Sequence, residues 1–209
     1  MRHMFQQGES DQLPTLVLLH GTGGTEDDLL PLAQNISPHS SVLGVRGNVV
    51  ENGMPRFFRR VSEGVFDLED LVFRTKELNQ FLNEASERYG FERDNVVALG
   101  YSNGANIATS LLFHYHDSLR GAILHHPMVP LRNKILPDLA DIPVFIGAGT
   151  QDSLCSQEET KELAIMLRTA GALVDIHWED DGHQITPEEI NAAKEWFQQK
   201  LPMIAAPQS

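Results

Sequence analysis

Three polar side chains, Ser102, Asp152 and His183, have the types and the order along the chain that nucleophilic acyl transfer needs. Ser102 is the centre of Gly100-Tyr-Ser-Asn-Gly104, which lies between an apolar run and a segment of helical character. A serine at a tight turn from strand to helix is held in a strained conformation that projects its hydroxyl above the sheet edge. The sequence therefore predicts Ser102 as nucleophile, His183 as its general base and Asp152 as the acid that orients His183.

Asp152 and His183 each come shortly after a segment that reads as a buried strand. Residues 143–148 lead to Asp152, and residues 172–178 lead to the loop that holds His183. The carboxyl ends of parallel strands share one edge of a sheet, so these side chains are expected to converge with Ser102. Two other acids are alternatives that we rank below Asp152, because they lie too close to His183 in sequence to orient it: Asp180 and Asp181.

A glycine-rich loop, His20-Gly-Thr-Gly-Gly24, follows the first apolar strand at residues 15–20. Glycines let such a loop turn its amides toward a nucleophile. We expect the backbone amides of Thr22 and Asn103 to form the oxyanion hole. His20 is expected to fix this loop through a hydrogen bond, and it is also a candidate for the pocket lining.

Taken together, these motifs resemble those of the α/β-hydrolase superfamily. More narrowly, the chain resembles the small bacterial branch of the phospholipase/carboxylesterase family, whose relatives include acyl-protein thioesterases. The resemblance extends from about Leu16 to the final helix and implies a serine hydrolase that cleaves small carboxylic esters through an acyl-enzyme. Acyl-thioesterase or lysophospholipase activity is the alternative within the family. An inactive scaffold that binds a ligand is the alternative from another class.

The pattern of apolar runs predicts a compact α/β fold with a mostly parallel, doubly wound sheet, formed by one domain over residues 1–209. Residues 2–13 are a candidate antiparallel edge strand. Thr186-Pro-Glu-Glu189 has the sequence of a capping box that begins the final helix. The expected strands lie near 15–20, 41–46, 95–100, 120–125, 143–148 and 172–178, and the expected helices near 26–36, 67–88, 104–115, 156–170 and 187–200.

The connection at residues 127–141 is too short for a cap domain of several helices, which predicts an open site that prefers short acyl groups. The longest irregular stretch elsewhere, residues 46–66, is expected to form a pocket wall. Arg56, Phe57 and Phe58 are its candidate pocket residues.

Four of the chain's 16 basic residues lie in that same stretch: Arg46, Arg56, Arg59 and Arg60. A guanidinium that faces the site could hold a carboxylate or phosphate in a bidentate manner, so an anionic ester is one candidate substrate. Ion pairs with Asp67, Glu69 and Asp70 are the structural alternative.

The formal net charge of −13 argues against nucleic acid as a partner. No apolar run approaches the length of a membrane span, and a single cysteine cannot form an internal disulfide. We therefore expect a cytoplasmic protein without stable membrane anchoring, and leave a homodimer open. The proposed chemistry implies neither a metal nor an organic cofactor.

Several other residues invite chemical interpretations that the sequence does not favour. Cys155 is not on a nucleophile turn, and His114 and His116 do not share a helix face for metal binding. The pair His125-His126 ends a strand at the active edge, where packing in the core or pocket wall is the preferred interpretation. A nucleotide-binding role for residues 21–25 is disfavoured because the loop lacks the full G-x-G-x-x-G and P-loop patterns.

Overall fold

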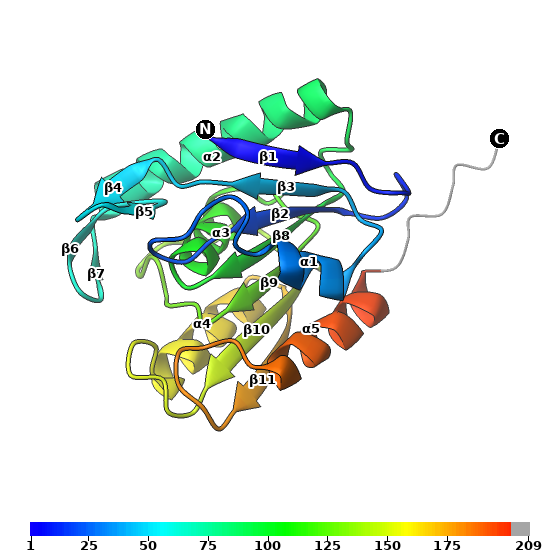
Figure 1. Cartoon of the computed structure of the whole chain (residues 1–209). Helices are drawn as coiled ribbons and strands as arrows, with labels where there is room; N and C mark the ends of the chain where they lie inside the picture. Colours follow the sequence, from blue (N-terminus) through cyan, green and yellow to red (C-terminus); the bar gives the residue numbers. More distant parts are fainter. Residues whose placement is uncertain (202–209) are drawn as a thin grey trace.

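The computed structural model describes residues 1–201, so the last eight residues of the predicted domain lie outside the description. Its centre is a seven-stranded sheet with the order β1-β3-β2-β8-β9-β10-β11 (Figure 1). All neighbours pair in parallel except β1, which pairs antiparallel with β3 and so provides the edge strand considered from the sequence. The strands are β1 His3–Gln6, β2 Thr15–Leu19, β3 Val42–Val45, β8 Val96–Tyr101, β9 Gly121–His125, β10 Pro143–Gly149 and β11 Leu173–Glu179.

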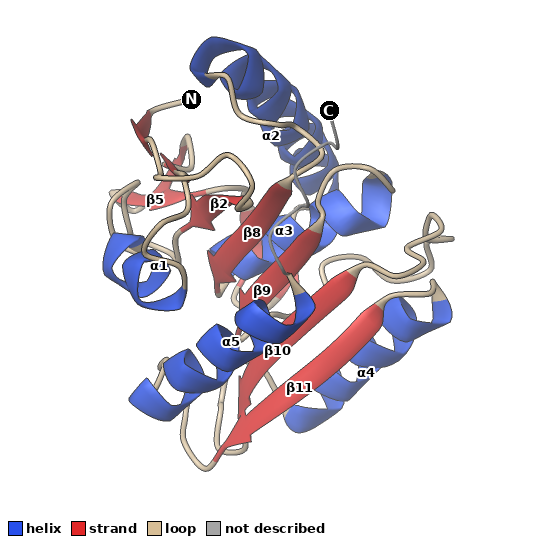
Figure 2. Ribbon diagram, turned by 90° about the vertical axis from the view of Figure 1, so that its right-hand side faces the viewer, coloured by secondary structure: helices blue, strands red, loops and turns tan. Residues whose placement is uncertain are grey.

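Helices cover both faces of the sheet (Figure 2). The central strands are continuous apolar runs because parallel strands are buried on both sides. One core lies between the sheet and α2, α3 and α4, and a second lies between the sheet and α1 and α5. These helices are α1 Leu30–Ile36, α2 Leu68–Tyr89, α3 Asn103–His114, α4 Gln157–Thr169 and α5 Pro187–Lys200.

Helix α1 is shorter than the segment 26–36 expected from the sequence. Pro31 lies in its first turn, where a fixed φ and a missing N–H are tolerated, so the helix begins there. Glu26 lies before the helix, is buried and pairs with Arg2 and Arg46.

The stretch 46–66 is not irregular but contains two short hairpins at the carboxyl edge of the sheet, β4 Val49–Glu51 with β5 Met54–Arg56, and β6 Arg60–Ser62 with β7 Val65–Phe66 (Figure 1). The first hairpin turns at Asn52-Gly53, where both φ angles are positive (52° and 80°). Asn-Gly favours this two-residue turn, so the sequence did contain a signal for the hairpin.

Residues 126–142, all within the described chain, contain neither a helix nor a strand. This agrees with the prediction that no cap domain covers the carboxyl edge. Within residues 1–201, none of the helices is both long and apolar enough to cross a membrane.

Candidate active site

Ser102 lies at the turn between β8 and α3 with φ 51° and ψ −112°. A positive φ is strained for a residue with a side chain, and here it lifts the serine out of both elements. A Cβ on Gly100 would come within 2.8 Å of the Ala105 backbone, and one on Gly104 would overlap the carbonyl of Leu19. The two glycines therefore allow the strand and helix to pack as closely as the turn requires.

The structure brings Ser102, His183 and Asp152 together in one hydrogen-bonded line. The Ser102 Oγ lies 2.8 Å from His183 Nε2, and His183 Nδ1 lies 2.7 Å from Asp152 Oδ2. Asp152 follows β10, and His183 lies in the loop between β11 and α5, as the sequence predicted. The Tyr101 hydroxyl donates a hydrogen bond to the His183 carbonyl at 2.7 Å, which helps to hold that loop.

The Asp152 carboxylate accepts hydrogen bonds from four N–H groups. Its Oδ1 accepts from the backbone amides of Leu154 and Cys155 at 2.8 and 2.9 Å, and its Oδ2 faces both His183 and His126. Burial alone would raise the pKa of Asp152, but the hydrogen bonds from Cys155, His183 and Leu154 outweigh burial and lower it. Asp152 is therefore ionised at neutral pH and can orient the imidazole of His183.

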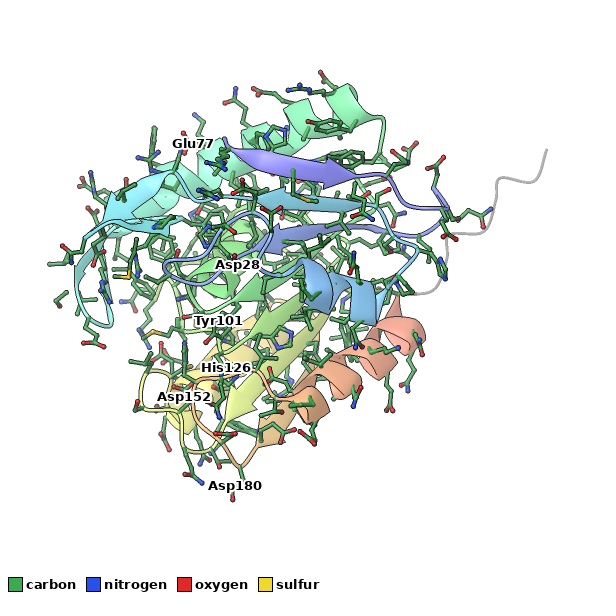
Figure 3. The ribbon with its side chains drawn as sticks, in the orientation of Figure 1. Asp28, Glu77, Tyr101, His126, Asp152 and Asp180 are labelled. Carbon is green, nitrogen blue, oxygen red and sulfur yellow. The ribbon has the colours of Figure 1, made fainter. Side chains whose placement is uncertain are left out.

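A second layer of buried titratable groups lies behind Asp152. His126 Nδ1 is 3.0 Å from Asp152 Oδ2, and its Nε2 is 3.2 Å from Glu189 Oε2. The other Glu189 oxygen bonds to His125 Nδ1. Figure 3 labels His126 and Asp152, which lie side by side at the carboxyl edge of the sheet. The sequence analysis assigned His125 and His126 to packing and did not anticipate this network.

Glu189 differs from the capping box expected at the start of α5. Thr186 does cap the helix by accepting the Glu189 amide at 3.1 Å, and Pro187 occupies the first turn. The Glu189 carboxylate, however, points to the two histidines. Burial would raise the pKa of Glu189, but the bonds and charges of His125 and His126 lower it to about 2.

His126, Asp152 and His183 are also the one group within residues 1–201 whose ligand atoms are close enough to hold a metal. The same atoms already bond to one another or to Glu189. We therefore interpret the group as a hydrogen-bonded network and not as a metal site.

The predicted oxyanion loop is held in place from two sides. His20 is buried, with Nδ1 at 2.6 Å from the Gly21 carbonyl and Nε2 accepting the Gly47 amide at 3.0 Å. The Gly23 amide donates to the Pro55 carbonyl, and Arg56 Nη1 donates to Thr22 Oγ1 at 2.6 Å. Thr22 lines the pocket beside Ser102.

Asn103 is the first residue of α3, so its N–H has no acceptor inside the helix and lies next to the nucleophile. Its side-chain Oδ1 accepts the Phe57 amide at 2.7 Å, which ties the segment after β5 to the turn. Both candidate oxyanion donors therefore belong to fixed backbone.

A pocket of about 470 Å³ opens above Ser102. Its apolar surface comes from Phe66, Met128 and Leu154, and its charged surface from Arg56, Arg60 and Glu63. The assignment of Arg56 to the pocket agrees with this lining. Within the described chain, residues 127–141 place no helix over this pocket, in agreement with the prediction from that short connection.

Three predicted pocket residues do not line the cavity. Phe57 and Phe58 are buried in the core under α2, because the apolar side chains of this segment turn inward and away from Ser102. His20 lies beneath the oxyanion loop, where its ring is tilted against the Phe57 ring with 4.8 Å between the ring centroids. Phe66, at the end of the second hairpin, supplies the aromatic surface instead.

The arginines of the 46–66 stretch have different roles. Arg46 pairs with Glu26, Arg60 with Glu51, and Arg59 with Asp67 and Asp70. Arg56 is almost fully buried, with Nε 3.5 Å from Glu51 and its guanidinium near the Phe58 ring. Arg56 is thus held at the pocket wall by its bonds to Thr22 and to the Phe58 carbonyl.

Three residues that were alternatives from the sequence have side chains with no role in the hydrogen-bonded line from Ser102 to Asp152. Burial raises the pKa of the Cys155 thiol to about 12, so it is not an activated nucleophile. The Asp181 carboxylate accepts the Gly182 amide and the Gln184 side chain, and Asp180 bonds to Thr150 and Gln151. Neither acid contacts the His183 ring.

The sheet order, the strained serine turn and the Ser-His-Asp line are those of an α/β-hydrolase. Residues 3–201 match the family model described as Phospholipase/Carboxylesterase, and the chain belongs to that family.

Individual relatives agree with this assignment. The chain is 58% identical over 201 residues to the putative hydrolase MhqD of Bacillus subtilis, covering 96% of this chain and all of that protein. It is similar to the crystal structure of a Bacillus cereus carboxylesterase at 60% identity and a TM-score of 0.95, covering 96% of this chain and 94% of that one. A structure of YahD with malic acid matches at 31% identity and a TM-score of 0.91, covering 95% and 98% of the two chains.

Proposed function

We propose that the chain is a serine carboxylesterase that cleaves small carboxylic esters through a covalent acyl-enzyme. Ser102 Oγ attacks the ester carbonyl while His183 Nε2 takes its proton, and Asp152 stabilises the imidazolium that forms. The amides of Thr22 and Asn103 stabilise the tetrahedral oxyanion. The imidazolium then protonates the leaving alcohol, and a water deprotonated by His183 releases the acid.

The observation that carries the proposal is the hydrogen-bonded line from Ser102 through His183 to Asp152 at 2.8 and 2.7 Å. A binding scaffold without activity would not need a serine in a strained conformation with its hydroxyl bonded to a histidine. The 60% sequence identity to the Bacillus cereus carboxylesterase, over 96% of this chain, supports the same activity.

Substitution of the nucleophile tests the proposal. Ser102→Ala should lower kcat/KM for p-nitrophenyl acetate by about 10⁴-fold or more and leave the circular dichroism spectrum unchanged. Ser153→Ala is a matched control, because Ser153 lines the same pocket but is not bonded to His183. Retention of more than about a tenth of the activity by Ser102→Ala would exclude Ser102 as the nucleophile.

The open pocket predicts a preference for short acyl chains. Without a helical cover it can bury only a few methylenes, each contributing about 0.8 kcal/mol. Rates on p-nitrophenyl esters should peak at roughly two to six carbons, and a maximum at long chains would contradict the open-pocket argument. The same acyl groups offered as thioesters would separate esterase from thioesterase activity.

We further propose that the natural ester carries an anionic group. The Arg56 guanidinium lines the pocket and is fixed by hydrogen bonds to Thr22 and the Phe58 carbonyl. Its carboxylate neighbour, Glu51, lies 3.5 Å from Nε, which is longer than a strong ion pair. A planar, fixed guanidinium is suited to a carboxylate. The structure of a 31% identical relative with malic acid, a dicarboxylic acid, supports this substrate class.

Paired substrates test the anion proposal. Arg56→Ala should raise KM for p-nitrophenyl hemisuccinate by about tenfold or more, the scale of a charged hydrogen bond, relative to its effect on p-nitrophenyl butyrate. Arg60→Ala is the control, because Arg60 lines the pocket but is paired with Glu51 at 2.7 Å. Equal changes on both substrates would show that Arg56 supports only the fold of the loop.

The remaining expectations from the sequence stay predictions. They are a cytoplasmic location, a single domain over residues 1–209, no nucleic-acid partner, no stable membrane anchoring, no cofactor, and a homodimer left open.

A further inference from the structure

We propose that His126 and Glu189 are positioning residues for the reaction, with His126 held as an imidazolium between the carboxylates of Asp152 and Glu189. This inference rests on the proposed function, because the group it positions is the acid of the Ser102 line. It assigns a role to two buried residues that the acyl-transfer chemistry itself does not require.

The hydrogen-bond geometry fixes the protonation of His126. Its Nδ1 lies 3.0 Å from Asp152 Oδ2, and its Nε2 lies 3.2 Å from Glu189 Oε2. An ionised carboxylate only accepts hydrogen bonds, so both ring nitrogens must donate, which requires the imidazolium. The side chains of all three residues are at least 99% buried, so water does not compete for these bonds.

Both carboxylates are ionised by their other contacts. Asp152 Oδ1 accepts the amides of Leu154 and Cys155, and Glu189 Oε1 bonds to His125 Nδ1. Burial lowers the pKa of His126, but the bonds and charges of Glu189 and Asp152 outweigh burial and raise it.

The groups that face His126 come from five parts of the fold. They are Tyr101 at the end of β8, whose ring meets the His126 ring edge-on at 6.1 Å, His125 on β9, Asp152 after β10, His183 after β11, and Glu189 on α5. Asp181 lies farther out in the loop that holds His183 and contributes a weaker charge. With both carboxylates charged and His126 cationic, the three groups Asp152, His126 and Glu189 together carry one net negative charge. That charge is left to stabilise the imidazolium of His183 as Ser102 attacks.

The backbone of the same segment supports this role. His126 has a φ of 52°, a conformation rare outside glycine, and its N–H donates to the Gly147 carbonyl at 2.8 Å. The preceding His125 carbonyl accepts the Ser102 amide at 2.9 Å. A Cβ on Gly147 would overlap the Glu189 carboxylate, so the glycine leaves room for the network. The His125-His126 segment thus joins the serine turn to β10, the strand that precedes Asp152.

Kinetics of a histidine variant test the positioning role. His126→Asn removes the imidazole, and asparagine tolerates the positive φ. We expect kcat for p-nitrophenyl acetate to fall by about tenfold to a hundredfold, the range found when a residue that orients a metal ligand is replaced, with KM changed by less than about twofold. His116→Asn is the matched control, since His116 is exposed. An unchanged kcat in His126→Asn would refute the positioning role.

Nitrogen-15 NMR of the histidine rings tests the charge state without any activity assay. In the wild-type protein at about pH 7, above the ordinary histidine pKa of 6.5, both His126 ring nitrogens should carry protons. In Glu189→Gln, His126 should lose a proton at a lower pH than in the wild type. A neutral His126 ring in the wild type would overturn the proposal, even if His126→Asn fails to fold. If instead Ser102→Ala kept its activity, the proposed function would fail while the NMR result still reported on His126.

Discussion

Replacement of Asp152 by asparagine changes one atom in the line that ends at Ser102. The Oδ1 position must still accept the amides of Leu154 and Cys155 at 2.8 and 2.9 Å, so the amide oxygen of the new side chain will take that position. Its NH₂ group then takes the Oδ2 position, which is 2.7 Å from His183 Nδ1 and 3.0 Å from His126 Nδ1. Two donors would face each other at both contacts.

His183 can relieve this conflict only by moving its proton from Nδ1 to Nε2. The Nε2 atom, 2.8 Å from the Ser102 hydroxyl, then cannot accept the serine proton. Loss of the correct tautomer lowers kcat by about 10⁴-fold in a triad of this type. At about 1.4 kcal/mol for each factor of ten, this corresponds to about 5.5 kcal/mol in the activation free energy.

The assay is kcat and KM on p-nitrophenyl acetate at neutral pH, with thermal melting to show that the variant is folded. Asp181→Asn is the matched control, because its carboxylate bonds to Gly182 and Gln184 and not to His183. Asp181→Asn should stay within about twofold of the wild type. Equal losses in the two variants would mean that Asp152 does not orient the base.

Three further predictions concern the packing and the buried charges. Gly104→Ala should lower the free energy of unfolding, measured in urea titrations, by more than about 2 kcal/mol, because the new methyl group meets the main chain of β2. Gly182→Ala is the control: it has open space around it and should change the free energy of unfolding by less than about 0.5 kcal/mol. Glu189 has a lowered pKa, so its contribution to stability is present above its unfolded pKa of about 4.5 and is lost as the pH falls toward 2. In urea titrations between about pH 5 and 3, the free energy of unfolding should therefore fall more steeply for the wild type than for Glu189→Gln. Cys155, with its pKa raised to about 12, should resist iodoacetamide at about pH 8 in the folded protein and react once it is unfolded in urea; rapid labelling of the folded protein would contradict its burial.

The elements and the Ser-His-Asp line were predictable because they depend on local signals. Apolar runs mark strands buried on both faces, and the flanking glycines and the order of Ser102, Asp152 and His183 mark the ends of those strands. The Asn52-Gly53 turn was also a local signal, and it was missed because the surrounding stretch of arginines and glycines was interpreted as a loop.

The rest depends on contacts between segments far apart in the chain. Phe57 and Phe58 are as apolar as a pocket wall would be, and only the tertiary fold shows that they turn into the core. The bond between His126 and Glu189 joins residues 63 positions apart, and Glu189 also fits the local pattern of a capping box. Sequence spacing therefore favoured the local interpretation, although the carboxylate is used elsewhere.

Covalent labelling tests the serine mechanism most directly. The protein should be treated with an organophosphonate ester, and the intact mass and the modified peptide should then be determined by mass spectrometry. The mechanism predicts one adduct per chain, located on Ser102, with no adduct in Ser102→Ala and slow labelling in Asp152→Asn. An adduct on any other residue, or labelling of Ser102→Ala at the wild-type rate, would contradict it.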